Sequence, residues 1–144
     1  MATTVGWALG RFLLPNLAWI IIGIGLGVMQ SLALQHRIPR AWRWLIATAA
    51  GWTIGALLIP LFSGEGQEFI VGMILGLTTG ICQWLILRKE VNLAGWWIVM
   101  MVVGWTSGLA LLPGILLTGV IAGGVTGFAL ELLLRTPRLK QIEP

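Results

Sequence analysis

Long apolar stretches alternate with short polar segments along most of this chain. Five stretches are long enough to be membrane-spanning helices, because a hydrocarbon core about 30 Å thick needs about 20 mostly apolar residues per helix. They cover Leu17–Leu34, Ala41–Phe62, Phe69–Leu87, Ala94–Leu112 and Ile115–Leu134. The pattern therefore predicts an all-α, polytopic transmembrane helix bundle with five spans.

Two short motifs recur, and they indicate that the spans are copies of one helical hairpin. The motif Gly-Trp-x-x-Gly, followed by Leu-Pro or Ile-Pro, occurs at 6–15, 51–60 and 104–113. A second motif begins Gly-x-x-Gln in its first two copies, and it occurs at 27–32, 80–85 and, more faintly, 127–132. We expect one integral membrane domain over 1–144, consisting of a partial repeat (1–15), two hairpin repeats (16–62 and 63–113), a last span (114–135) and a tail (136–144).

The first 15 residues correspond to only the second half of a span. A free amino group at mid-bilayer would be costly, so we expect a short amphipathic helix at the outer interface. Arg11 would lie near the headgroups, and Pro15-Asn16 would turn into the first span. A re-entrant half-helix against the bundle is the alternative. Residues 1–5 carry no basic segment, so we expect no cleaved signal peptide.

The composition fits a bilayer better than water. Of the 144 residues, 58% are hydrophobic and 10% are charged, with a mean hydropathy of +0.94, which leaves too little polar surface to cover a soluble core. The net charge of +4 comes from basic residues in short loops. Because these residues do not form one basic face, no nucleic-acid partner is expected.

The loops alternate in charge. If every span crosses once, the loops around Arg37 and Arg88 and the segment after Arg135 share one side, while the acidic loop 63–68 and the Pro113-Gly114 turn share the other. By the positive-inside rule, the basic side is cytoplasmic. The C-terminus is therefore expected in the cytoplasm and the N-terminus on the opposite side.

Glycines occur at four-residue spacing in every span, which places small residues on one helix face. Such faces let helix backbones approach closely in lipid, so we expect them to be packing surfaces. The predicted packing residues are Gly23, Gly27, Gly51, Gly55, Gly72, Gly76, Gly80, Gly104, Gly108, Gly119, Gly123 and Gly127.

Nine tryptophans and no tyrosine are present. The tryptophans beside the basic loops are expected to form an interfacial aromatic belt; they are Trp42, Trp44, Trp84, Trp96 and Trp97. Trp52 and Trp105 lie near mid-membrane. They are expected to fill space beside a glycine and to donate their N–H groups to a carbonyl or to a hydroxyl such as that of Thr53, Thr106 or Ser107. Stacking on a pigment or lipid is the alternative.

Gln30 and Gln83 hold equivalent positions in the two hairpins. An amide in hydrocarbon must be hydrogen-bonded, so these side chains are expected to clamp neighbouring helices together. One alternative is a polar pathway lined together with Thr78 and Thr79. Another is coordination of a cation or of a chlorin magnesium.

No catalytic constellation is apparent in the sequence, and we expect no enzyme. No carboxylate pair is spaced for acid–base chemistry, and the single Cys82 and single His36 lack partners for a metal centre. Glu131 lies four residues before Arg135, which favours an ion pair on one helix face.

The runs 80–88, 94–98 and 104–108 resemble small multi-pass membrane proteins abundant in cyanobacteria and some other bacteria. The resemblance implies a bacterial inner (plasma) or thylakoid membrane and leaves the molecular role open. Two hypotheses follow: a scaffold or accessory subunit that packs against itself or a larger membrane complex, and a small homo-oligomeric channel or transporter. The sequence requires no cofactor, but lipid, chlorophyll or carotenoid would fit the first hypothesis.

Overall fold

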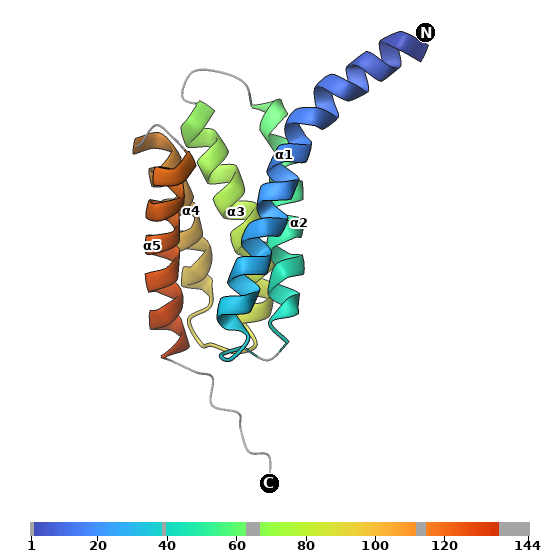
Figure 1. The fold of residues 1–144 in the computed structure, drawn as a ribbon. Helices are drawn as coiled ribbons and strands as arrows, with labels where there is room; N and C mark the ends of the chain where they lie inside the picture. The colour runs from blue at the N-terminus through green and yellow to red at the C-terminus, as the bar shows by residue number, and fades with distance from the viewer. Residues whose placement is uncertain (1, 39, 63–66, 112–114, 136–144) are drawn as a thin grey trace.

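The structure, a computed structural model, is all-helical in the residues it describes, which are 2–38, 40–62, 67–111 and 115–135; side chains are described for 17–38, 40–62, 67–110 and 118–135. Its elements are α1 (Ala2–Leu34), α2 (Trp42–Leu58), the short 3₁₀ helix η1 (Ile59–Leu61), α3 (Gln67–Leu87), α4 (Gly95–Leu111) and α5 (Ile115–Leu134) (Figure 1). The predicted Pro113-Gly114 turn, the segment 63–66 and the tail 136–144 lie outside the described residues.

Within the described residues, three segments are long and apolar enough to cross a membrane: Leu17–Leu34, Trp42–Leu61 and Gln67–Leu87. The remaining two helices are apolar but shorter over their described parts, Gly95–Ala110 and Thr118–Leu134. The length and composition of the three segments are those of transmembrane helices.

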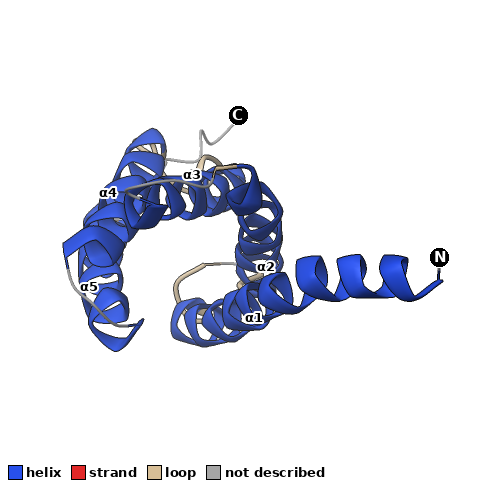
Figure 2. Cartoon of the chain, turned by 90° about the horizontal axis from the view of Figure 1, so that it is seen from above, coloured by secondary structure: helices blue, strands red, loops and turns tan. Residues whose placement is uncertain are grey.

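The helices form an open arc (Figure 2). Within the described chain, each long helix packs only against its neighbours in sequence, so α1 and α5 are the two ends of the arc and do not pack together. The α1–α2 and α3–α4 loops and the C-terminal end of α5 lie at the same end of the bundle (Figure 1). We call this the basic end, because the loop arginines and lysine cluster there.

The N-terminal part differs from the expectation. α1 is one continuous helix from Ala2 to Leu34, so the predicted turn at Pro15-Asn16 is absent and residues 2–16 do not form a separate helix. A proline removes one backbone hydrogen bond and bends a helix, but it does not have to end it. The N-terminal part of α1 extends beyond the bundle, on the side away from α5 (Figure 2).

Candidate functional site: a glutamine–tryptophan network between the hairpins

A buried network of polar side chains joins the two hairpins near the basic end. The Nε1–H of Trp44 donates to Oε1 of Gln30 over 2.9 Å, and Nε2 of Gln83 donates to the same oxygen over 3.2 Å. Nε2 of Gln83 also donates to Oγ1 of Thr48 over 2.8 Å. The network therefore ties together α1, α2 and α3.

The fourth helix joins through a copy of the first contact. The Nε1–H of Trp97 donates to Oε1 of Gln83 over 3.0 Å, fourteen residues apart in sequence, as are Gln30 and Trp44. The two indoles also touch, with ring centroids 5.6 Å apart and planes at 62°. The glutamine–tryptophan hydrogen bond thus occurs once in each hairpin, and the indoles of the two copies pack edge to face.

Because these side chains are buried, their hydrogen bonds affect the stability of the protein. Gln83 is 0% exposed, and Trp44 and Trp97 are 1% and 2% exposed. The apolar cluster around the two indoles includes Leu87 and Met101. A buried amide or indole N–H without a partner would cost about 1–3 kcal/mol, so each of these groups depends on the others.

This burial corrects the prediction for two of the five belt tryptophans. Trp44 and Trp97 lie in the core, whereas Trp42 and Trp96 are 58% and 57% exposed, as headgroup-level residues would be. Trp84 is half-buried, and the guanidinium of Arg88 lies 5.1 Å from its ring centroid. Proximity to a basic loop does not decide burial, because neighbouring helix positions point about 100° apart.

A second tryptophan layer fills the bundle farther from the basic end. Trp52 stacks at a tilt on Trp19, with centroids 5.8 Å apart, and meets Trp105 edge-on at 5.0 Å. Trp52 is buried and also packs over Gly23. A Cβ added to Gly23 would lie 2.3 Å from the Cβ of Trp52. The indole thus fills space beside a glycine. The hydroxyls of Thr53 and Ser107 donate to carbonyls of their own helices.

Thr78 and Thr79 are not brought into the glutamine network. The hydroxyl of Thr78 donates to the carbonyl of Ile74 on its own helix over 2.8 Å. Thr79 is buried against Gly51, and its Oγ1 has no hydrogen-bond partner among the described residues. The residue that completes the network is instead Thr48, which lies outside both repeated motifs.

Most predicted packing glycines lie at close helix contacts. An added Cβ at Gly51 would lie 2.4 Å from the Cα of Thr79, and at Gly76 it would lie 2.6 Å from the carbonyl oxygen of Met101. Contacts of 3.5 Å or less to neighbouring helices are found in the same way at Gly23, Gly27, Gly55, Gly72, Gly80, Gly104 and Gly108.

The three glycines of α5 differ. Nothing lies within 4 Å of a Cβ built on Gly119, Gly123 or Gly127, so their predicted packing role has no partner among the described residues. The physical reason is the open arc: among the described helices, α5 packs only against α4, which leaves this face uncovered.

Glu131 bridges two parts of the basic end. The predicted pair with Arg135 is present at 3.4 Å, and Nη1 of Arg37 contacts the other carboxylate oxygen at 2.6 Å. The second contact connects the α1–α2 loop to α5 across the mouth of the arc. All three side chains are substantially exposed, so the pair contributes little stability.

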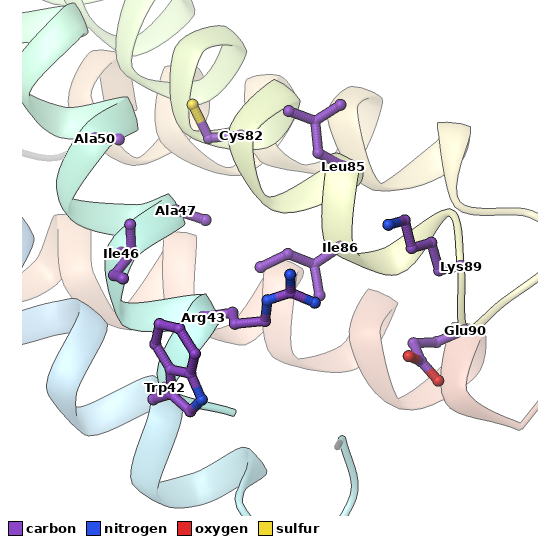
Figure 3. A pocket seen from close by; sticks show the side chains of 10 residues that line it. All are labelled: Trp42, Arg43, Ile46, Ala47, Ala50, Cys82, Leu85, Ile86, Lys89 and Glu90. Atoms are coloured by element: carbon purple, nitrogen blue, oxygen red, sulfur yellow. The ribbon is translucent and has the colours of Figure 1, made fainter. Parts of the chain in front are cut away.

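A groove of about 420 Å³ opens between α2 and α3 at the basic end (Figure 3). Its floor is apolar and includes Ala47, Ala50 and Cys82, while Arg43, Lys89 and Glu90 lie toward its polar side. The combination of an apolar floor and cations beside the loops suits an amphiphile. In the described part of the chain, no group of three or more His, Cys, Asp or Glu residues could hold a metal ion.

Comparison with known proteins finds no matching family, curated protein or solved structure.

Proposed function

We propose that this chain is a non-catalytic integral membrane scaffold or accessory subunit, with five helices that each cross the bilayer once. It acts by packing its glycine-rich helix faces against itself or a larger membrane complex. The basic end faces the cytoplasm by the positive-inside rule. The membrane is a bacterial inner or thylakoid membrane.

One observation carries this proposal: α5 has a glycine face without a partner among the described residues, while the central polar side chain, Gln83, is fully used in contacts within the chain. The amide of Gln83 is fully buried and engaged by Trp97 and Thr48. Among the described residues, nothing lies within 4 Å of a Cβ added to Gly119 or Gly123. Faces of this kind associate helices in lipid, because small residues allow close backbone contact.

The rival function is a channel or transporter with a pathway lined by Gln30, Gln83, Thr78 and Thr79. It has less support, because a side chain that lines a pathway must present a free polar atom to the passing solute. The amide of Gln83 is occupied on both its nitrogen and its oxygen, and the hydroxyl of Thr78 is directed to its own helix.

The groove at Arg43 and Lys89 supports a lipid partner. Basic pockets between helices on the cytoplasmic side attract anionic headgroups, and the apolar floor would accept an acyl chain. We infer that an anionic lipid is the molecule held here, since the groove combines an apolar floor with two cations, Arg43 and Lys89, against one carboxylate, Glu90.

The double variant Gln30→Leu/Gln83→Leu separates the scaffold from the channel. The scaffold account predicts a lower Tm in detergent and no change in solute flux through proteoliposomes. A channel would lose flux without the same loss of stability. Gln35→Leu is the matched control, because Gln35 is exposed beyond the end of α1; a loss of stability equal to that of the double variant would refute the clamp.

A further inference from the structure

The groove between α2 and α3 has a counterpart between α4 and α5, also at the basic end. We call the groove of Figure 3 the α2–α3 groove and its counterpart the α4–α5 groove. The α4–α5 groove has a volume of about 210 Å³ and an apolar lining. The residues that line it are Leu93, Trp96, Met100, Ala129, Leu132 and Leu133.

The two grooves are copies of one feature. The helices correspond when Gly51 of α2 is aligned with Gly104 of α4, and Gly80 of α3 with Gly127 of α5. Lining residues of one groove then fall on lining residues of the other: Arg43 on Trp96, Ala47 on Met100, Cys82 on Ala129, Leu85 on Leu132 and Ile86 on Leu133. Duplication of the hairpin has thus produced the same surface feature twice.

The copies differ in charge. The α2–α3 groove is lined by Arg43, Lys89 and Glu90, whereas none of the residues lining the α4–α5 groove is charged. Trp96 takes the place of Arg43. In the sequence, Thr136 takes the place of Lys89, although it lies outside the described residues. The two grooves therefore share an apolar floor but not the cations beside it.

The charged side chains near the end of α5 are paired with one another. Glu131 and Arg135 do not line the α4–α5 groove. Their side chains contact each other at 3.4 Å, and Arg37 contacts the other carboxylate oxygen of Glu131 at 2.6 Å. The cation of Arg135 is thus already matched by a carboxylate.

Uncharged polar and aromatic groups replace the cations at the head of the α4–α5 groove. Trp96 is 57% exposed, as suits an indole at headgroup level. A more open hollow of about 330 Å³ shares Leu93 and Trp96 with the groove and adds the exposed Asn92. An amide both donates and accepts hydrogen bonds, so Asn92 can bind a polar headgroup without requiring that it be charged.

We propose that the α4–α5 groove binds a lipid whose headgroup carries no net charge, with an acyl chain against the apolar floor. Trp96 and Asn92 would lie beside the headgroup. The proposal rests on the proposed function, which places an anionic lipid in the α2–α3 groove, and it adds a second lipid site with a different headgroup preference.

The expected difference follows from the cations alone. Each basic side chain favours an anionic headgroup by about fivefold, so the loss of two removes a preference of about thirtyfold. Glu90 in the α2–α3 groove reduces that difference, and we expect at least tenfold. Since selectivity is a difference of affinities, a groove with the same floor and no cations loses its preference for anionic lipid while it still accepts an acyl chain.

The test is photolabelling of the full chain in phosphatidylcholine nanodiscs. Two probe lipids carry a diazirine at the same position of the same acyl chain; one is phosphatidylglycerol, which is anionic, and the other is phosphatidylcholine, which has no net charge. Peptide mass spectrometry compares the label on residues 82–90 with that on residues 129–135. Label at Met29 of α1, which is 72% exposed, gives the background of non-specific lipid contact.

The proposal predicts that the phosphatidylcholine probe labels residues 129–135 above this background. It also predicts a ratio of phosphatidylglycerol to phosphatidylcholine label at least tenfold higher in the α2–α3 groove than in the α4–α5 groove. Equal ratios in the two grooves would overturn it. So would label at residues 129–135 that does not exceed the background with either probe, which is the result expected if a second protein chain covers this groove.

Trp96→Arg gives the α4–α5 groove the cation of its counterpart. It should raise phosphatidylglycerol label at residues 129–135 about fivefold and leave the α2–α3 groove unchanged. Gln35→Arg is the matched control, because Gln35 is exposed at the same end and lines neither groove. An equal rise in both variants would show that the effect is not local to the groove, and would contradict the proposal.

The two grooves also separate this inference from the proposed function. Enrichment of phosphatidylglycerol in the α2–α3 groove, with no label above background in the α4–α5 groove, would refute only this inference. Absence of enrichment in both grooves would refute this inference and the anionic lipid of the proposed function together.

Discussion

The indole of Trp97 donates a 3.0 Å hydrogen bond to the amide oxygen of Gln83, fourteen residues earlier in the chain. The amide nitrogen of Gln83 is engaged by the first hairpin, through Thr48 and Gln30. One side chain thus holds both repeats, and it does so at a fully buried position. In lipid, where no hydrophobic force drives helices together, such a side chain has a direct effect on the stability of the bundle.

Gln83→Leu should therefore destabilise the protein by about 1–3 kcal/mol, because the Trp97 N–H loses its buried acceptor. Gln30→Leu should cost less, since Gln30 is only half-buried. Thermal unfolding in detergent measures both. In a double-mutant cycle, Gln83→Leu and Trp97→Phe should be strongly non-additive; simple additivity would show that the hydrogen bond does not contribute.

Replacement by valine should affect stability differently at two buried threonines, Thr48 and Thr79. Thr48 accepts from Gln83 and donates to the carbonyl of Trp44, so Thr48→Val should lower the stability by about 1 kcal/mol or more. Thr79→Val should be neutral or stabilising, because the Thr79 hydroxyl has no partner among the described residues. Equal Tm values for the two variants would contradict the assigned network.

A glycine at a close helix contact should tolerate substitution less well than a glycine that faces open space. Gly76→Leu would place a side chain where an added Cβ already meets the Met101 carbonyl oxygen at 2.6 Å. It should cost about 1–3 kcal/mol or prevent folding, since a packed contact must separate. Gly25→Leu is the control, because its position on α1 is open. Expression level and Tm together report the difference, and a destabilised Gly25→Leu would argue against this packing.

Replacing both cations of the groove should weaken its retention of anionic lipid. Each basic side chain near an anionic surface is worth about 1 kcal/mol, so Arg43→Gln/Lys89→Gln should reduce the affinity for anionic lipid by roughly thirtyfold and lower the amount that co-purifies. Lipid mass spectrometry on the purified protein measures this. Arg40→Gln, at the same end but outside the groove, should have little effect. Equal lipid content in all three proteins would remove the groove as a lipid site.

Local pattern was enough to predict the helices, the close glycine contacts of α1 to α4 and the Glu131–Arg135 pair. It was not enough for Trp44 and Trp97, whose place beside a basic loop suggested an interface; the informative signal was their constant spacing from Gln30 and Gln83. The Arg37–Glu131 contact joins residues 94 apart, and it depends on how the arc curves. The continuity of α1 through Pro15 likewise could not be predicted from a motif that ends other helices.

We propose that this protein works by association within the membrane. The most direct measurement is its particle mass after extraction at native expression level into lipid nanodiscs, together with an absorbance spectrum of the same peak. The account predicts a stable assembly larger than the 15.6 kDa chain, with lipid and no pigment absorbance. A single chain per particle that conducts solute in liposomes would contradict it.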